Sequence, residues 1–199
     1  MKLDRTFYCR DDVVGISREL LGKVLCTRLD GRPTSAIITE TEAYAGAGDR
    51  ASHAYGGRRT RRTEPMFGPG GRAYVYLCYG IHHLFNVVTN VEDTPHAILV
   101  RAGKPLDGVE TMLERRGKST VGRSLMGGPG SLASALGIRT DHTGTDLLGE
   151  QIWIEDRGFR VDAGSVTAGP RIGVDYADED AHLPYRFVAA LNIQPARQL

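Results

Sequence analysis

Apolar residues with helical spacing open the chain. Val13, Ile16 and Leu20 lie three or four positions apart and follow two aspartates at positions 11 and 12. This spacing places the three side chains on one face of a helix. Either aspartate can cap the helix, and Gly22 can end it. The pattern therefore predicts a short amphipathic helix near the N-terminus.

Two strands follow, and their side chains alternate. Lys23–Arg28 and Ser35–Tyr44 are joined across Asp30-Gly31, a dipeptide that favours a hairpin turn. Because neighbouring side chains of a strand point to opposite faces, the second strand should have two distinct sides. We expect Ala36, Ile38, Glu40 and Glu42 on one face, and Ile37, Thr39, Thr41 and Ala43 on the other.

The remaining pattern predicts a long loop, several strands and two short helices. The polar loop Ala45–Gly71 is rich in glycine and arginine, and a loop of this length in a compact domain usually serves a function. Ala73–Thr89 should form two strands around a tip at Cys78–Ile81. Other strands are expected at Ala97–Ala102, Ile152–Glu155, Arg171–Val174 and Arg186–Ala190. One helix should run through Arg116 to Gly117, with Asp107 and Glu110 as a capping-box-like pair, and another should span Leu132–Leu136.

These elements predict the fold class. Strands outnumber helices and mostly join as neighbours, and 199 residues with 41% apolar side chains suffice for one core. We therefore expect a single α+β domain over residues 1–199, with an antiparallel, partly barrel-like sheet, peripheral helices and a protruding β-hairpin. No stretch approaches the ~18 consecutive apolar residues of a membrane span, so no membrane partner is expected.

Cysteine usage and the N-terminus bear on the compartment. Cys9, Cys26 and Cys78 are odd in number and scattered, which argues against a disulfide framework. The first five residues contain no apolar export segment. We expect a cytoplasmic protein.

The net charge of +1 hides an uneven distribution. Arg50–Arg72 contains six arginines and one acid, and Arg101–Arg123 contains six basic residues and three acids. Asp141–Asp180 contains ten acids and three arginines. A basic middle is the electrostatic signature of a polyphosphate partner, although solvated surface arginines explain the same pattern. If the basic zone binds phosphates, the acidic third should face away from them.

Two glutamates are candidates for acid–base chemistry. Glu40 and Glu42 end a strand, where glutamate is intrinsically unfavourable. One of them can be a surface charge, and the other a partly desolvated carboxylate that acts as a general base. Spacing alone also allows two ordinary paired or solvated side chains.

The tyrosines of Tyr74–Gly80 differ in their expected surroundings. Tyr74 and Tyr76 share one strand face, and Tyr74 is expected in the core. Tyr79 lies beside a turn glycine and should be exposed. An exposed aromatic side chain near arginine-rich loops suits stacking on bases, or wedging between base steps.

The histidines suggest a further hypothesis, namely that the protein binds a metal ion. His53, His83 and Glu42 could be ligands of a metal-dependent hydrolase. However, no paired Cys/His spacing occurs, and the neighbours His82 and His83 point to opposite faces of a strand. No nucleotide-binding glycine motif with a phosphate-loop lysine is present either. We expect no metal and no cofactor.

Several blocks in order resemble the alkyladenine (3-methyladenine) DNA glycosylase family, the eukaryotic type that also occurs in bacteria. The blocks are Ile38–Tyr44 (ITETEAY), Ala51–Ala54 (ASHA), Met66–Gly70 (MFGPG), Tyr74–Gly80 (YVYLCYG), Gly128–Leu132 (GPGSL) and Pro170–Ala177 (PRIGVDYA). Together they cover about residues 5 to 190. Two segments depart from the family pattern: Gly57–Glu64 replaces a Thr-Pro-Arg-Asn segment, and the loop near Glu92–Pro95 is longer.

The resemblance implies a base-excision-repair enzyme. Such an enzyme flips an alkylated or deaminated purine out of duplex DNA and hydrolyses its N-glycosidic bond, which leaves an abasic site. By resemblance, Glu42 is the general base that activates water and Arg101 helps to hold that water. Tyr44, His53 and Tyr76 stack around the flipped base, Asn86 crowds the 2-amino group of guanine, Ile172 forms an apolar wall, and Tyr79 intercalates.

The residue types agree with this reading in two respects. An aromatic pocket attracts a cationic alkylated base. The segment Thr39–Asn86 contains no lysine, which disfavours a Schiff-base step and favours a monofunctional enzyme. We expect a monomer that binds double-stranded DNA with damaged purines and associates with the bacterial nucleoid when bound. The alternative is a non-catalytic module that binds damaged DNA or RNA.

Overall fold

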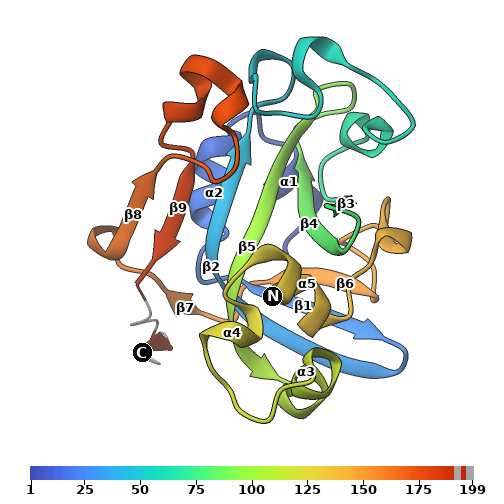
Figure 1. Ribbon diagram of the computed structural model, residues 1–199, viewed down its shortest axis with the longest axis vertical. Coiled ribbons are helices and arrows are strands. Elements are labelled where there is room, and N and C mark those ends of the chain that lie inside the picture. Colours follow the sequence, from blue (N-terminus) through green and yellow to red (C-terminus); the bar gives the residue numbers. More distant parts are fainter. Residues whose placement is uncertain (191–193, 196–199) are drawn as a thin grey trace.

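The fold is built on one curled antiparallel sheet (Figure 1). A computed structural model describes residues 1–190 and 194–195. The strands are β1 (Val24–Leu29), β2 (Arg32–Tyr44), β3 (Ala73–Cys78), β4 (His82–Thr89), β5 (His96–Asp107), β6 (Ile152–Glu155), β7 (Phe159–Arg160), β8 (Val166–Gly169), β9 (Arg186–Ala189) and β10 (Gln194–Pro195). Eight of them form the sheet in the order β3-β4-β5-β2-β1-β6, with β9 pairing to both β2 and β8. β7 and β10 pair separately. The predicted α+β class with a partly closed antiparallel sheet is confirmed.

Short helices cover the sheet. They are α1 (Arg5–Tyr8), α2 (Val13–Glu19), α3 (Val109–Arg116), α4 (Arg123–Met126) and α5 (Pro129–Leu136). Ile16 and Leu20 of the α2 region, Leu132 of α5 and Phe85 of β4 are buried in one apolar core, which supplies the main hydrophobic stabilisation. Within the described residues, no helix combines the length and the apolar character that crossing a membrane requires.

Elements with strong local signals lie where the sequence predicts them. Asp12 caps α2 by accepting a hydrogen bond from the Gly15 amide, at 2.8 Å. The β3–β4 hairpin and β6 match their predicted positions. Ala45–Gly71 contains three short 3-10 turns and no strand, as expected of the long loop. All three cysteines are free.

Two predictions about secondary structure are wrong, and a third strand is longer than predicted. Arg171–Val174 is not a strand, because the Arg171 side chain is buried in an ion pair that fixes an irregular backbone path. Asp107 does not cap α3: its carboxylate accepts hydrogen bonds from Ser35 and Arg157, and Gly108 occupies the cap position. The predicted strand Ala97–Ala102 is confirmed within β5, which continues to Asp107 along β2.

A double irregularity in the β2–β5 pairing corrects the predicted faces of β2. The register passes from Ile38–Gly103 to Glu40–Ala102 to Thr41–Val100, so Thr39 and Arg101 are each skipped. Bulges of this kind re-aim the side chains that follow. The main core accordingly contains Ile38 before the bulge and Ala43 after it, which differ by an odd number of positions. Glu42 therefore lies on the face opposite to that of Ile38, contrary to the predicted alternation.

A buried ion pair ties the long loop to the C-terminal part of the chain. The Arg171 guanidinium donates hydrogen bonds to both carboxylate oxygens of Asp49 and, at 2.9 Å, to the Ala43 carbonyl. Both charged side chains are almost completely buried, with 0% and 2% exposure. The Asp49 carboxylate also accepts from the amides of Ala45 and Ala51. This pair fixes the segment that begins at Arg171 against the end of β2.

We predict that Asp49→Asn strongly destabilises the protein, because it leaves the Arg171 charge buried without its partner. Removing one member of a buried pair costs about 3–5 kcal/mol. Urea unfolding followed by circular dichroism measures the loss. Asp178→Asn is the matched control: Asp178 forms an exposed pair with Arg50, and such pairs contribute about 0–1 kcal/mol. Equal losses in the two variants would contradict the assignment.

Candidate functional site

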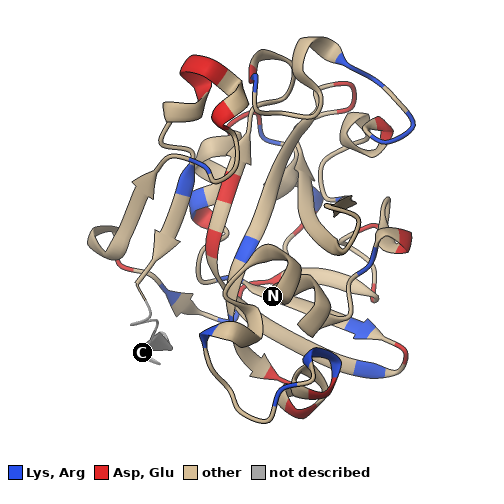
Figure 2. Ribbon diagram, in the orientation of Figure 1, with Lys and Arg blue, Asp and Glu red and all other residues tan. Residues whose placement is uncertain are grey.

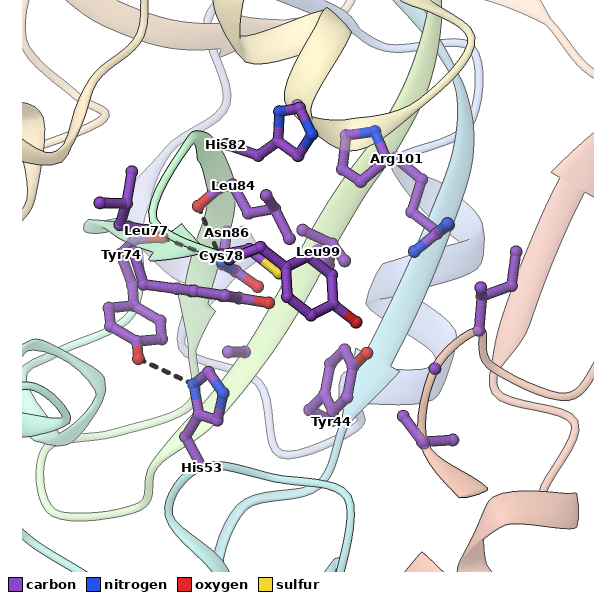
Figure 3. A pocket seen from close by; sticks show the side chains of 18 of the residues that line it. Tyr44, His53, Tyr74, Leu77, Cys78, His82, Leu84, Asn86, Leu99 and Arg101 are labelled. Carbon is purple, nitrogen blue, oxygen red and sulfur yellow. Dashed lines mark hydrogen bonds between the residues drawn. The ribbon is translucent and has the colours of Figure 1, made fainter. Parts of the chain in front are cut away.

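A cavity of about 700 Å³ lies between the end of β2, the β3–β4 hairpin, the long loop and residues 172–176 (Figure 3). Seven of the eight predicted site residues line it: Tyr44, His53, Tyr76, Tyr79, Asn86, Arg101 and Ile172. These residues come from distant parts of the sequence, so the fold brings the predicted set together. A concave site with aromatic walls and a few converging polar groups is typical of small-molecule or base pockets.

Glu42, the eighth, lies directly behind the cavity wall and is completely buried. Its Oε1 accepts a hydrogen bond from the Ile172 amide at 2.8 Å. Its Oε2 accepts one from the Tyr44 hydroxyl at 2.8 Å and one from Arg101 Nη1 at 3.3 Å. All three partners are hydrogen-bond donors. An ionised carboxylate has acceptor oxygens only, so this set of partners matches that form. The three donors also line the cavity.

Arg101 is held by two glutamates. Its Nε donates to Glu40 Oε1 at 3.0 Å, while Nη1 donates to Glu42. Glu40 Oε1 accepts a second bond from Arg186 Nε of β9, at 2.7 Å. Glu40 is 15% exposed, so neither glutamate of the pair is a surface charge. Sequence reasoning identified Glu40 only as one of two candidate acid–base groups, and it indicated neither its contact with Arg101 nor a role for Arg186. Only the pairing of β2 with β5 and β9 brings these residues together.

Tyr44 contacts charged groups on two sides. Its hydroxyl donates to Glu42, and the Arg171 guanidinium stacks over its ring at 4.8 Å. Burial and the neighbouring Glu42 carboxylate raise the pKa of Tyr44 well above its ordinary value. The phenol therefore stays protonated at neutral pH and remains a donor to the carboxylate.

His53 and Tyr74 form an aromatic wall across the cavity from Tyr44 (Figure 3), and Tyr76 packs against both of their rings. His53 Nδ1 lies 2.9 Å from the Tyr74 hydroxyl, and its ring meets that of Tyr76 edge to face at 4.7 Å. Tyr74 is buried, as predicted, but it also lines the cavity. Burial, reinforced by Arg62 and Arg58, lowers the pKa of His53 to about 4. His53 is therefore neutral at physiological pH.

Arg62 is a cavity residue that sequence reasoning missed. Its guanidinium stacks over the Tyr76 ring at 5.2 Å. The available signal was the run of four arginines between positions 58 and 62, but the run does not show which member turns inward.

Asn86 and Ile172 complete the walls. Asn86 Nδ2 donates to the carbonyls of Tyr74 and Leu84, at 3.0 and 3.3 Å, which fixes the side chain at the cavity. The Ile172 side chain is half-exposed, although its amide binds Glu42. The structure thus places both residues at the predicted pocket, and their predicted roles in base selection stay predictions.

Tyr79 occupies the tip of the β3–β4 hairpin and is 91% exposed, as predicted. Tyr79 and Gly80 have φ values of 51° and 73°, and the Ile81 amide donates to the Cys78 carbonyl. Two successive positive φ values define a type I′ turn, whose first central position favours Asn, Asp or Gly. A bulky residue in this conformation is uncommon and strained. The turn therefore presents a large aromatic ring to solvent despite a local cost.

The residues of the hypothetical metal site are engaged elsewhere. His83 Nδ1 accepts a hydrogen bond from the Thr140 amide, while His53 faces Tyr74. Across the part of the chain that the structure describes, no three His, Cys, Asp or Glu side chains gather as a metal-binding group.

The charged residues near the cavity do not follow the expected distribution; Figure 2 marks the positions of Lys, Arg, Asp and Glu along the ribbon. Arg50 and Arg59 form ion pairs, whereas Arg58, Arg61 and Arg62 have no carboxylate within 4 Å among the described residues. The expectation that the acidic third faces away is wrong for the 3-10 segment Asp175–His182. That segment packs beside the cavity, because Asp180 accepts a hydrogen bond from the Arg50 amide and Tyr176 lines the wall.

Comparison with known proteins agrees with the ordered sequence blocks. The family model for methylpurine-DNA glycosylase (MPG) matches residues 6–193. A Chlamydia felis protein is 43% identical over 99% of this chain and 100% of its own length. Proteins of Chlamydia abortus and Bacillus thuringiensis are 46% and 44% identical over 94% of this chain, and 97% and 95% of theirs. All three carry the provisional name 3-methyladenine DNA glycosylase. The chain therefore belongs to the methylpurine-DNA glycosylase family.

Proposed function

We propose that this chain is a monofunctional DNA glycosylase that removes alkylated or deaminated purines, among them 3-methyladenine, from duplex DNA. The names of its relatives support this function. The observation that carries the proposal is the buried Glu42 carboxylate, whose three hydrogen-bond donors all line an aromatic cavity. Residues 1–199 would form one catalytic domain that acts as a monomer in the bacterial cytoplasm, without a metal or cofactor.

The cavity suits a flipped purine. Tyr44 on one side and His53 with Tyr76 on the other provide flat aromatic surfaces, which attract a base that alkylation has made cationic. His53 is neutral at physiological pH and so adds no positive charge next to that base. Tyr79, exposed on its hairpin tip, would fill the gap that the flipped base leaves in the stack.

Hydrolysis would use Glu42 as a general base. A water oxygen bonds to C1′ of the sugar while the C1′–N bond breaks and its electron pair leaves with the base. Glu42 takes the proton of the water. The Arg101 bond is the longest of the three contacts to the Glu42 carboxylate, at 3.3 Å. The water would therefore bridge or replace this contact between Glu42 and Arg101. In either case Arg101 would lie beside the reacting oxygen of the water.

Glu40 would be a positioning residue in this scheme. It holds Nε of Arg101 while Nη1 faces Glu42, and Arg186 holds Glu40 in turn. A guanidinium that is bound at two of its edges cannot rotate freely, so Arg101 should stay oriented toward the water without contact between Glu40 and the substrate.

We predict that Glu42→Gln abolishes base release but retains binding to lesion DNA. Loss of a general base costs about 10²–10⁴-fold in rate. Duplexes with a single hypoxanthine, ethenoadenine or 7-methylguanine are incubated with each protein and then treated with hot alkali, and release of 3-methyladenine is measured from methylated DNA. Wild-type strand breaks should appear only after alkali. Binding without release by the wild type, for every lesion, would instead favour a non-catalytic module.

We predict that Glu40→Gln lowers the single-turnover excision rate while lesion binding changes less than about twofold. Hydrogen bonds to charged groups contribute about 1.5–3 kcal/mol, so the rate should fall about 10–100-fold. Glu155→Gln is the matched control, because Glu155 is a partly buried strand glutamate that pairs with Arg157 away from the cavity. An unchanged rate in Glu40→Gln, or equal losses in both variants, would remove Glu40 from the positioning role.

We predict that His53 titrates near pH 4 and that its burial destabilises the folded state in acid. The unfolded histidine has a pKa near 6.5 and binds a proton first, so stability should fall as the pH drops from about 6.5 to about 4. NMR titration of the His53 ring measures the midpoint. Urea unfolding from pH 7.5 to pH 4.5 should show a smaller acid loss in His53→Gln. A His53 midpoint near 6.5 would contradict the prediction.

A further inference from the structure

A second hollow lies beside the β3–β4 hairpin, between its tip and the α3–α5 pair. It has a volume of about 490 Å³ and is lined by Ile81, His82 and His83 of the hairpin and by Arg115, Arg116 and Arg139, among other residues. We call it the arginine groove. It shares His82, Arg116 and Gly130 with the aromatic cavity, so the two hollows adjoin.

The three arginines of the groove form no ion pair within the part of the chain that the structure describes. Arg115 donates only to neutral groups, namely Thr34 Oγ1 and the carbonyls of Ala135 and Leu29. Arg116 donates to the Leu125 and Ser124 carbonyls. Within the described residues, none of the three guanidinium groups has a carboxylate within 4 Å, and no Asp or Glu lines the groove. This arrangement contrasts with Arg50, Arg59 and Arg101, which all form ion pairs.

Arg115 and Arg139 are close enough for their charges to interact. Burial, together with the like charges of Arg32 and Arg139, lowers the pKa of Arg115, and Asp30 and Glu114 act in the opposite direction. Gly137, which ends α5 with a φ of 76°, leaves room for the Arg115 side chain, because a Cβ there would lie 2.8 Å from the Arg115 guanidinium carbon. Repelling cations that are fixed by packing favour a bound anion.

His83 adds a hydrogen-bond donor to the same groove. Its Nδ1 accepts a hydrogen bond from the Thr140 amide at 3.2 Å. In the neutral ring the proton therefore resides on Nε2, which can donate to an acceptor. The groove thus combines guanidinium forks with an imidazole donor, a set that matches the oxygens of a phosphodiester.

We propose that the arginine groove binds a backbone phosphodiester of duplex DNA on the side of the hairpin away from the flipped base. This inference rests on the proposed function. The exposed Tyr79 of the hairpin tip lines the cavity, and the exposed Ile81, two residues further on, lines the adjoining groove. When the hairpin tip enters the base stack of a duplex, the backbone phosphates of the DNA pass on both sides of the tip. The phosphate in the groove would fix the register of the DNA and carry no sequence information.

Arg139 is the residue on which to test the proposal, because it is exposed and lines the groove but not the cavity. Binding of an undamaged duplex is measured by fluorescence anisotropy over a series of salt concentrations. Arg139→Gln should weaken binding several-fold and reduce the slope of log K against log salt by about 0.9, the value for one phosphate contact. Arg139→Lys should recover most of the slope.

Arg160→Gln is the matched control for net charge, because Arg160 is exposed on β7 and pairs with Asp156. It should leave the salt slope unchanged. Thermal unfolding of Arg139→Gln checks that the variant is folded. A slope that is equal in wild type and Arg139→Gln, or one that falls equally in Arg160→Gln, would overturn the proposal.

A second measurement locates the phosphate. Single methylphosphonates are placed one at a time along both strands around the lesion. At one position, the methylphosphonate should weaken DNA binding by the wild type. It should not weaken DNA binding by Arg139→Gln any further, since that variant has already lost the contact. Additive losses at every position would contradict a contact with Arg139. Excision assays are independent of these titrations, so a wild type that binds in this way but releases no base would reject the proposed function and keep the groove.

Discussion

The burial of the Glu42 carboxylate is the constraint on which the rest of the site depends. A charge without access to water is costly unless polar partners surround it, and the three partners of Glu42 come from three separate places: Tyr44 on the same strand, Arg101 on β5, and the backbone amide of Ile172. Each partner must itself be fixed. The paired bulges of β2 and β5 aim Glu42 and Arg101 at each other, and the Arg171–Asp49 pair fixes the segment that supplies the amide. The aromatic cavity is consequently anchored to a network of buried charges.

Local signals predicted much of this fold. The α2 cap, the β3–β4 hairpin, β6 and the glycine that ends α3 depend on residues within a few positions of one another, and the sequence displays those residues directly. The wrong predictions concern segments whose conformation is decided by residues far away in the sequence. Arg171–Val174 has the β-branched character of a strand, but its conformation is decided by Asp49, 122 residues away. No glycine marks the bulge at Thr39, so simple alternation failed there.

The residues of the site could largely be predicted from the sequence, but the hydrogen bonds and ion pairs that connect them could not. Seven residues that the family resemblance indicated do line one cavity, because the motifs that carry them occur in order and at consistent spacing. The hydrogen-bonded chain Arg186–Glu40–Arg101 was not predicted, since it depends on strand register. The charge pattern also needed the structure. The basic middle of the sequence includes arginines that are neutralised by pairing, such as Arg50 and Arg59. Only the remainder, such as Arg61, Arg62 and Arg116, can attract phosphates.

The turn at Tyr79 has a consequence for how this protein can evolve. Because a left-handed backbone favours Asn or Gly, substitutions at this position that relax the turn would raise the stability of the fold while they remove the aromatic side chain at its tip. If Tyr79 intercalates as proposed, selection for stability and selection for the exposed ring act in opposite directions on a single codon. A more stable relative with a small residue at the hairpin tip would mark a lineage in which the second pressure has been relaxed.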